Sequence, residues 1–436
     1  MLASETRRRV DAIWYRIWAS GVSNPLTAIE YFSTVLLLRR LSDKQEDGPS
    51  ENLWQELVDH IASSDPVAVA RLMLRVQSEF GIGASPDVAA PSTWRDLKTL
   101  GDVLSEVSQL DLTDRNHDIL GDLFEYVLGR LNSAGHFGQF RTPQHLIRFI
   151  VNVVDPKSGE VVADPGCGTA GFLVAAHEHR GGARERYLGD EVDATVARIA
   201  HTNMLLHGMK GAEIRHGDGL ARHERDADVI LANPPFAGSV IAERVSGFKS
   251  GTLKTELLFM ELMMNRLVDG GRAGVVVPTG VLTSPSAGAV WVRRQLLESN
   301  RLRAVVELPG GVFRPYTDVR TAVLFWNNDA PTTDVLLVKV AADGYSLDDR
   351  REPVDQDDLL DVTALLAGGP AAIPHARVPV ADIAAQRYNL SPSRYIEHAG
   401  DGPPPLPPVN LAEALRDSRE RLESAYGALA RMEALL

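Results

Sequence analysis

The sequence predicts an α/β protein with a doubly wound, mostly parallel sheet, an N-terminal α-helical domain and a C-terminal helix. Three observations predict this architecture. Apolar residues recur at helical spacing through residues 1–132, strand-like and helix-like segments alternate between residues 160 and 340, and an apolar heptad pattern runs through residues 411–436. Helical spacing predicts amphipathic helices, and strands that alternate with helices predict parallel strands joined by crossover helices.

Bulk composition limits the classes of protein to which the chain can belong. Its 436 residues allow two or three domains, and 44% hydrophobic with 24% charged residues is ordinary for a globular protein. A single cysteine excludes an intrachain disulfide framework, which favours a cytoplasmic location. The longest uncharged run, 273–292, contains prolines and glycines and does not predict a membrane span. The net charge of −13 argues against unaided binding to DNA, because phosphate attraction dominates nonspecific affinity.

Residues 1–132 are predicted to form a bundle of helices. The apolar faces comprise Ile13, Trp14, Ile17 and Trp18, then Tyr31, Val35, Leu36 and Leu38, then Ile119, Leu123, Phe124, Val127 and Leu131. A glycine-containing segment, 133–138, interrupts this pattern. Thr142-Pro143 predicts the next helix, with Thr142 as N-cap and Pro143 in the first helical position, and this helix extends to about Val154.

The second region, 133–345, is predicted to hold the sheet. We expect strands at 160–164, 186–191, 213–216, 228–232, 272–278, 303–308, 319–326 and 335–340, and helices at 171–179, 194–207, 255–267 and 289–299. Residues 346–400 form a mixed extension. In the last region, 401–436, a proline-rich stretch predicts a stiff linker, and the heptad pattern behind it favours a helix for docking a partner. A helix that packs on its own protein is the alternative.

A glycine-rich loop follows the first predicted strand. Gly166, Gly168 and Gly171 match a GxGxxG pattern, and Glu191 lies twenty residues beyond Gly171. That spacing fits a dinucleotide site, in which the glycines allow close approach of the backbone and the acid binds ribose hydroxyls. A simple tight turn between strand and helix is the alternative. Cys167 lies inside this loop and is interpreted as a small packing residue rather than a nucleophile.

Two acidic residues favour S-adenosylmethionine over NAD as the ligand of this loop. Asp164 precedes the glycines, where it would repel a pyrophosphate but would bind the amino group of a methionine moiety. Asp218 follows the third strand of this region and is placed to hydrogen-bond an adenine amino group. The carboxyl ends of parallel strands meet at one edge of a sheet, so these groups are expected to converge.

Asn233-Pro234-Pro235-Phe236 follows the fourth strand. The Asn233 amide oxygen and the Pro234 carbonyl can both accept hydrogen bonds from one exocyclic amino group, and the Phe236 ring can stack on the base that carries it. The motif therefore predicts a site that activates an aminated planar base such as adenine. The alternative is a Pro-Pro turn followed by a core phenylalanine.

Basic residues outside this site are candidate contacts to DNA phosphates. They are Lys249 and Lys254 in the loop 237–254, and Arg293, Arg294, Arg301 and Arg303. A mobile surface loop and a solvated helix end explain the same residues equally well.

Taken together, these motifs resemble the modification (methyltransferase) subunits of type I restriction-modification systems, which are adenine-N6 DNA methylases. The resemblance rests on segments spread over most of the chain: 14–43, 138–143, 164–172, 189–191, 203–208, 233–236, 255–259, 270–278 and 388–391. One residue departs from the family pattern, since Ala170 stands where the family usually has glycine. The resemblance implies that the sheet is the Rossmann-like sheet of methyltransferases and that 133–345 is the methyltransferase domain.

The resemblance also implies the chemistry of the site. S-adenosylmethionine is the expected cofactor, held by Phe140, Thr142, Pro143, Asp164, Gly166, Gly168, Thr169, Gly171, Glu191 and Asp218. The expected catalytic residues are Asn233, Pro234, Pro235 and Phe236, and no metal is expected. The substrate would be the N6 amine of an adenine rotated out of double-stranded DNA.

Partners follow from the same resemblance. We expect double-stranded DNA and a DNA specificity subunit, with a restriction (motor-nuclease) subunit as an open further partner and no membrane. Two alternatives remain open: methylation of a protein glutamine or an RNA base, and a scaffold that binds cofactor without transferring a methyl group.

Overall fold

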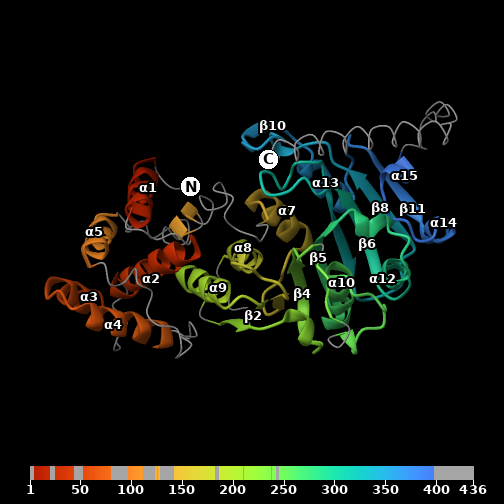
Figure 1. Cartoon of the computed structure of the whole chain (residues 1–436). Helices are drawn as coiled ribbons and strands as arrows, with labels where there is room; N and C mark the ends of the chain where they lie inside the picture. The colour runs from red at the N-terminus through yellow and green to blue at the C-terminus, as the bar shows by residue number, and fades with distance from the viewer. Residues whose placement is uncertain are drawn as a thin grey trace, which may run out of the picture. The chain divides into compact units, whose positions relative to one another are not determined.

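The computed structural model describes residues 4–19, 25–43, 53–79, 97–110, 123–124, 126–127, 142–181, 186–209, 211–236, 238–241 and 245–396 (Figure 1). The predictions for the segment 133–138, for Phe140 and for the linker and heptad helix in 401–436 lie outside these residues. The chain divides into two units, 1–392 and 393–436, and of the second only α15 (Ser393–Ile396) is described.

The N-terminal part is helical where it is described, as predicted. It contains α1 (Ser4–Ala19), α2 (Pro25–Asp43), α3 (Leu53–Ala62), α4 (Pro66–Glu79) and α5 (Leu97–Ser108). Of the predicted apolar residues whose side chains the structure describes, Ile13, Val35 and Phe124 are buried in one hydrophobic cluster. The start of helix α4 is fixed by Asp65, whose carboxylate accepts the backbone N–H groups of Val67 and Ala68.

A nine-stranded sheet forms the centre of the remaining structure. Its strands are β1 (Val161–Asp164), β2 (Arg186–Glu191), β3 (Ala212–His216), β4 (Ala227–Ala232), β5 (Leu267–Pro278), β6 (Arg301–Glu307), β7 (Thr321–Asn327), β8 (Asp334–Lys339) and β11 (His375–Pro379). They lie in the order β11-β8-β6-β7-β5-β4-β1-β2-β3. Only β7 and β11 run antiparallel to their neighbours. The predicted mostly parallel α/β fold is confirmed.

Helices cover both faces of this sheet (Figure 1). On one face α7 (Gln144–Val154), α8 (Gly171–His179), α9 (Ala194–Leu206) and α13 (Leu359–Leu366) share a hydrophobic cluster with alternate residues of the strands. The other face carries α10 (Thr255–Arg266) and α12 (Ala287–Glu298), which contact β5 and β6, with the short α11 (Gly280–Thr283) between them in the chain. Helices on both faces are typical of doubly wound sheets.

Most predicted boundaries differ from the observed ones by one or two residues, and two of the differences have an identifiable reason. Strand β5 begins at Leu267 rather than at residue 272, because Gly270 adopts φ +79° and the pairing with β4 shifts register there, as in a β-bulge. Helix α7 begins at Gln144 rather than Pro143. Pro143 is the N-cap and has an extended backbone, so Thr142 precedes the cap instead of forming it.

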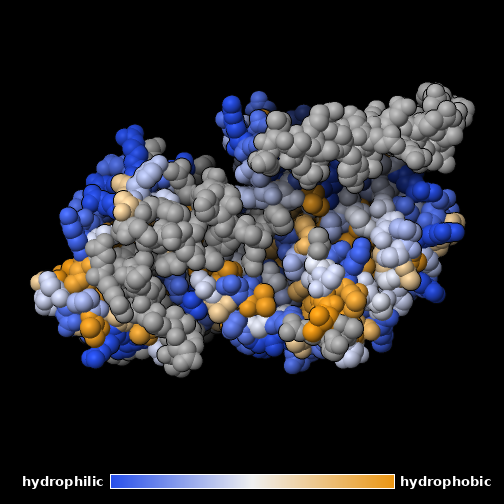
Figure 2. All heavy atoms as spheres, in the orientation of Figure 1, coloured by the Kyte–Doolittle hydropathy of each residue, from blue (hydrophilic) through white to orange (hydrophobic). Residues whose placement is uncertain are grey.

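The mixed segment after β8 adds to the sheet. It contains the hairpin of β9 (Asp343–Tyr345) and β10 (Pro353–Asp357), then α13, β11 and α14 (Val380–Ala385). None of the described helices has the length and apolar character needed to span a lipid bilayer. Figure 2 shows that hydrophilic residues predominate on the displayed face, with separate hydrophobic patches.

Candidate cofactor and catalytic site

Three strands bring the predicted site residues to one edge of the sheet. β1 lies between β2 and β4 and runs parallel to both. Asp164 ends β1, Glu191 ends β2 and Asn233 follows β4. These three residues therefore lie at the carboxyl ends of adjacent strands, where ligands bind in open α/β sheets.

The glycine loop turns with two residues in the left-handed region. Gly168 has φ +53° and Ala170 has φ +66°, and Ala170 caps the start of α8. A non-glycine residue in this region costs roughly 1–2 kcal/mol. Ala170 therefore adopts, at an energetic cost, a turn that glycine would adopt without strain.

Side chains and backbone from neighbouring elements hold this loop at three successive residues. Cys167 donates its backbone N–H to the Asp190 carbonyl (3.0 Å), and Gly168 donates to Oε2 of Glu191 (3.1 Å). The Asn203 side chain, fully buried in α9, donates to the Thr169 carbonyl (2.8 Å). The sequence pattern gave Asn203 no role, although a polar residue on the buried side of a helix is a usable signal.

Asp164 is the buried acid of the site. Its side chain accepts the backbone N–H of Gly166 at 3.0 Å, and the residue is only 2% exposed. Burial raises the pKa of Asp164 to about 8, and the charges of Glu191 and Asp190 add to the rise. The site is therefore short of positive charge, and a cationic ligand would stabilise the ionised carboxylate.

A buried ion network supports this end of β2. Asp190 pairs with Arg266 (3.0 Å) and with Arg215 (2.7 Å), and Arg266 pairs in turn with Asp226 (3.1 Å). Both Asp190 and Arg266 have fully buried side chains. Because arginines neutralise Asp190, the acids left to meet a ligand here are Asp164 and Glu191.

The third strand places Asp218 beside the same loop. Its carboxylate accepts the N–H of Leu220 (3.0 Å) at the start of the short 3₁₀ turn Gly219–Ala221. Gly219 packs so tightly that an added Cβ would lie 1.9 Å from the Pro165 carbonyl oxygen. The turn that carries Asp218 is therefore in direct contact with the glycine loop.

The start of α7 approaches the other side of the loop. An added Cβ on Gly171 would lie 3.2 Å from Cδ1 of Ile147, in the first turns of α7. Thr142 and Pro143 immediately precede this helix, and Thr142 is buried. Their predicted place near the cofactor loop is consistent with this contact.

The Asn-Pro-Pro-Phe motif lies next to the glycine loop. An added Cβ on Gly166 would be 3.8 Å from Cδ of Pro235, which is van der Waals distance. Asn233 and Phe236 are half-buried, Pro234 is buried and Pro235 is exposed. Phe236 packs in part against the core of the α/β region, which leaves the rest of its ring accessible.

A family model now identifies the chain. The model described as N-6 DNA Methylase matches residues 115–401, well over half of the 436 residues. The chain belongs to the N-6 DNA methylase family. The EcoEI type I restriction enzyme methylase subunit of Escherichia coli is 35% identical over 258 residues, which cover 54% of this chain and 52% of the relative.

Further relatives agree with this family. The StySJI methylase subunit of Salmonella typhimurium is 31% identical over 338 residues, 70% of this chain and 64% of the relative. The chain thus spans about half to two thirds of the length of these curated relatives. A solved chain from work on complex assembly and conformational transition of the type I R-M system is 25% identical, has a TM-score of 0.69 and covers 98% of both chains.

In this member of the N-6 DNA methylase family, the loop after the Asn-Pro-Pro-Phe motif is attached at its base. The Thr255 N–H donates to the Gly238 carbonyl (3.1 Å), and Ser239 and Lys254 form an antiparallel bridge. Glu261 of α10 is 1% exposed, and its carboxylate accepts the backbone N–H groups of Lys249 (2.6 Å) and Ser250 (3.0 Å). Sequence reasoning missed Glu261, although an acid among the apolar residues of α10 was a signal.

The candidate phosphate contacts have different surroundings. Arg293 is buried and donates to three backbone carbonyls, so its predicted phosphate contact is wrong. Arg294 pairs with Glu298 and Arg301 with Asp329. Arg303 makes no ion pair or hydrogen bond with the residues that the structure describes.

Cys167 is buried, and burial raises the pKa of its thiol. A protonated thiol packed against Gly189 is a poor nucleophile, which supports its interpretation as a packing residue. Among the described residues, no cluster of histidine, cysteine and acidic side chains is suited to hold a metal ion.

Proposed function

We propose that this chain transfers a methyl group from S-adenosylmethionine to the N6 amine of an adenine rotated out of double-stranded DNA, as the catalytic subunit of a type I restriction-modification complex. One observation carries the proposal. A Cβ added to Gly166 of the cofactor loop would lie 3.8 Å from Cδ of Pro235 in the Asn-Pro-Pro-Phe motif, so the two segments lie close together at the carboxyl edge of the sheet. A cofactor and a base held by these two segments would be adjacent.

The residues around the loop fit S-adenosylmethionine. Asp164 is buried with a raised pKa, and Glu191 lies beside it, so a ligand with positive charge is favoured over a pyrophosphate. The cofactor would supply a methyl group on a positively charged sulfur. Asp164 and Thr142 would hold its methionine end, Glu191 its ribose hydroxyls and Asp218 its adenine amino group. The oxygens of Glu191 that accept backbone N–H groups retain lone pairs for this purpose.

The Asn-Pro-Pro-Phe motif would hold the target base. Asn233 Oδ1 and the Pro234 carbonyl would accept the two N–H groups of the adenine amine, which keeps the nitrogen lone pair available for attack. The accessible part of Phe236 would stack on the ring. Positioning of the two reactants supplies much of the rate enhancement, and rotation of the base out of the duplex costs about a few kcal/mol.

Partner subunits would supply the positive charge that this chain lacks for binding DNA. Its net charge of −13 disfavours phosphate contacts, and curated relatives are named methylase subunits of type I restriction enzymes. We therefore infer that a specificity subunit provides most of the affinity for DNA and recognises the DNA target sequence. A restriction subunit would be a second partner.

Transfer of a radiolabelled methyl group to duplex DNA by the purified chain with its specificity subunit tests the proposal. We expect N6-methyladenine in the product, and Asn233→Ala is expected to reduce transfer at least a hundredfold while the cofactor Kd changes less than threefold. Label found only in protein or RNA would support the alternative substrates. Cofactor binding without transfer to any of the three would indicate a scaffold.

A further inference from the structure

A buried carboxylate joins the start of α7 to the hairpin of β9 and β10. Asp343 is the first residue of β9, and its Oδ2 lies 2.9 Å from Nε2 of His145 and accepts a second hydrogen bond from Arg351. The side chain of Asp343 is fully buried. An ionised carboxylate only accepts hydrogen bonds, so His145 and Arg351 both act as donors to it.

Tyr345 completes this group of side chains, which we call the Asp343 cluster: His145, Asp343, Tyr345 and Arg351. The ring centroid of Tyr345 lies 4.4 Å from that of His145 and 5.6 Å from the guanidinium carbon of Arg351. Arg351 adopts φ +50°, a left-handed conformation that is costly for a non-glycine residue and persists only where its surroundings hold it. The cluster is therefore a well-defined part of the fold.

Asp343 is ionised in the cluster and brings negative charge to the start of α7. Burial would raise the pKa of Asp343, but the hydrogen bonds from His145 and Arg351 outweigh burial and hold the pKa below its ordinary value of 3.8. Pro143 caps α7 without a side-chain hydrogen bond, and the first turn of the helix has no acidic residue. Because helix N-termini favour negative charge, the carboxylate from β9 supplies what the first turn lacks.

The Asp343 cluster lies at the same edge of the sheet as the proposed methyl-transfer site. β8 runs parallel to β6, and β7 runs antiparallel to both β6 and β5, so β8 has the direction of β5 and β4. Asp343 comes shortly after the end of β8, and Asn233 directly follows β4. Both residues therefore lie at the carboxyl edge.

The first turn of α7 connects the cluster to the cofactor loop. Thr142 is buried and lies three residues before His145 in the chain. A Cβ added to Gly171 of the loop would lie 3.2 Å from Cδ1 of Ile147, so this part of α7 is close to the loop. A displacement of His145 would therefore move Thr142 relative to the loop.

The far end of α7 is fixed independently. Arg272 donates to the Val154 carbonyl at 2.6 Å. Asp155 caps the end of the helix, and its Oδ1 lies 3.0 Å from Nε2 of His179. Loss of the Asp343 contact would leave these bonds in place and would release only the start of the helix.

We propose that His145, Asp343 and Arg351 are positioning residues for the cofactor. Through His145, the buried carboxylate holds the first turn of α7, and this turn keeps Thr142 at the methionine end of S-adenosylmethionine. The inference rests on the proposed function, because the contact between Thr142 and the cofactor belongs to that function. The Asn-Pro-Pro-Phe motif is not part of the cluster, so loss of the cluster is expected to weaken cofactor binding rather than to slow the transfer step.

Cofactor binding and methyl transfer by the complex of this chain with its specificity subunit test the inference. His145→Ala is expected to raise the Kd for S-adenosylmethionine about tenfold, because a hydrogen bond to a charged group is lost. Turnover at saturating cofactor and DNA is expected to stay within about twofold of the wild type, as for a residue that affects binding alone. His145→Gln is expected to restore most of the affinity, since its amide N–H can donate to Asp343 in place of Nε2.

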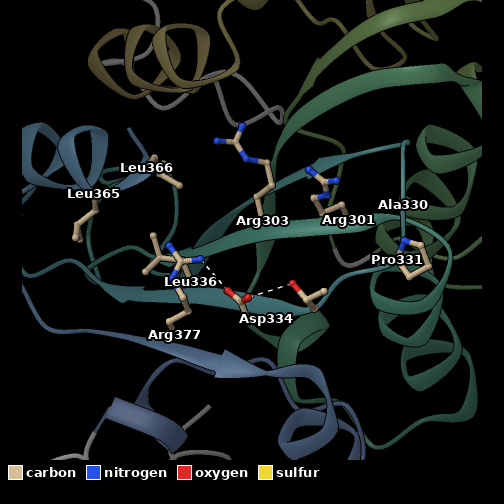
Figure 3. A pocket seen from close by; sticks show the side chains of 10 residues that line it. Arg301, Arg303, Ala330, Pro331, Asp334, Leu336, Leu365, Leu366 and Arg377 are labelled. Atoms are coloured by element: carbon tan, nitrogen blue, oxygen red, sulfur yellow. Dashed lines mark hydrogen bonds and ion pairs between the residues drawn. The ribbon is translucent and has the colours of Figure 1, made fainter. Parts of the chain in front are cut away.

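Two side-chain pairs of the same chemistry, away from the cofactor loop, provide matched controls. His179→Ala breaks the contact with Asp155 at the far end of α7 and is expected to leave the Kd unchanged. Arg351→Met is expected to weaken cofactor binding, whereas Arg377→Met is not. Arg377 pairs at 2.8 Å with Asp334, which begins β8, so this pair lies at the other end of β8 from the cluster (Figure 3).

Equal Kd values for His145→Ala and the wild type would overturn the inference. A His179→Ala variant that loses as much affinity as His145→Ala would also overturn it, since the stability of α7 as a whole would then explain both results. Lower turnover of His145→Ala without a change in Kd would contradict a positioning role for the cofactor. A wild-type complex that binds the cofactor but does not methylate DNA would instead contradict the proposed function.

Discussion

Glu191 accepts the backbone N–H of Gly168 at 3.1 Å, so the acid that ends β2 also fixes the middle of the cofactor loop. Its other oxygen accepts the N–H of Asp193 at 2.8 Å. The residue is 5% exposed, and both oxygens are therefore engaged before any ligand arrives. One side chain combines loop support with the proposed contact to ribose.

Glu191→Gln is expected to weaken cofactor binding at least tenfold. The glutamine amide has one acceptor oxygen, so its NH₂ group must face one of the two backbone N–H groups, and a buried unsatisfied donor costs about 1–3 kcal/mol. Isothermal titration with S-adenosylmethionine measures the effect. Glu213→Gln is the control, because Glu213 lies on the neighbouring strand β3 with its side chain half exposed. Equal affinities for wild type and Glu191→Gln would contradict the assignment.

Asp164 predicts a specific dependence of stability on pH. Its folded-state pKa is about 8, against an ordinary value of 3.8, so the folded protein holds this proton more tightly than the unfolded chain. The resulting stability is fully present below about pH 4 and is lost as pH rises through 8. Asp164→Asn keeps an acceptor for the Gly166 N–H but cannot ionise. Its melting temperature relative to the wild type is expected to increase from pH 5 to about pH 8 and then to level off toward pH 9, in the absence of cofactor.

A constant difference in melting temperature between Asp164→Asn and wild type over that range would show that Asp164 is ionised at neutral pH. The effect of cofactor gives a second measurement. A cationic ligand would lower the pKa of Asp164, so binding near pH 7 is expected to release a proton. Titration calorimetry in two buffers of different ionisation enthalpy detects that proton.

Ala170→Gly is expected to stabilise the protein by about 0.5 kcal/mol. Relief of the left-handed conformation at φ +66° gains roughly 1–2 kcal/mol, whereas loss of the buried methyl group and the greater freedom of glycine in the unfolded chain cost about 1 kcal/mol together. Urea denaturation measures the difference. A loss of more than 1 kcal/mol would mean that packing of the methyl group outweighs backbone strain.

Glu261→Leu is expected to reduce methyl transfer at least tenfold without changing cofactor affinity. The substitution removes the acceptor for the N–H groups of Lys249 and Ser250, and the loop that follows Asn233–Phe236 loses its attachment to α10. Single-turnover transfer and cofactor titration separate the two effects. Glu261→Gln is expected to fall between wild type and Glu261→Leu, because its amide oxygen can still accept one of the two N–H groups. A parallel loss of cofactor affinity would show a general defect of the fold.

Local sequence patterns predicted the helices and strands that carry the site, with small errors at their ends. The helix at 171–179 and the strand at 186–191 match α8 and β2 at both ends, because glycines and charged residues mark their boundaries. The direction of β7 was not predicted. Whether a strand runs parallel or antiparallel depends on its neighbours in the sheet, and alternation of apolar residues carries no information about them.

The residues that support the site could not be paired from the sequence either. Asn203 holds the Thr169 carbonyl and Arg266 holds Asp190, and in each pair the partners are far apart in the sequence. A buried polar side chain must find a partner, but the sequence does not say which one.

The sequence alone determined which residues carry chemistry here: the acids at strand ends, the glycine loop and the Asn-Pro-Pro-Phe motif. Only the tertiary structure decided which of them are neighbours. It brought the turn at Gly166 close to Pro235 and gave Asp164 a buried and acidic environment. Motifs are local properties of the chain, whereas proximity, burial and electrostatic environment arise from the packing of segments that are distant in sequence.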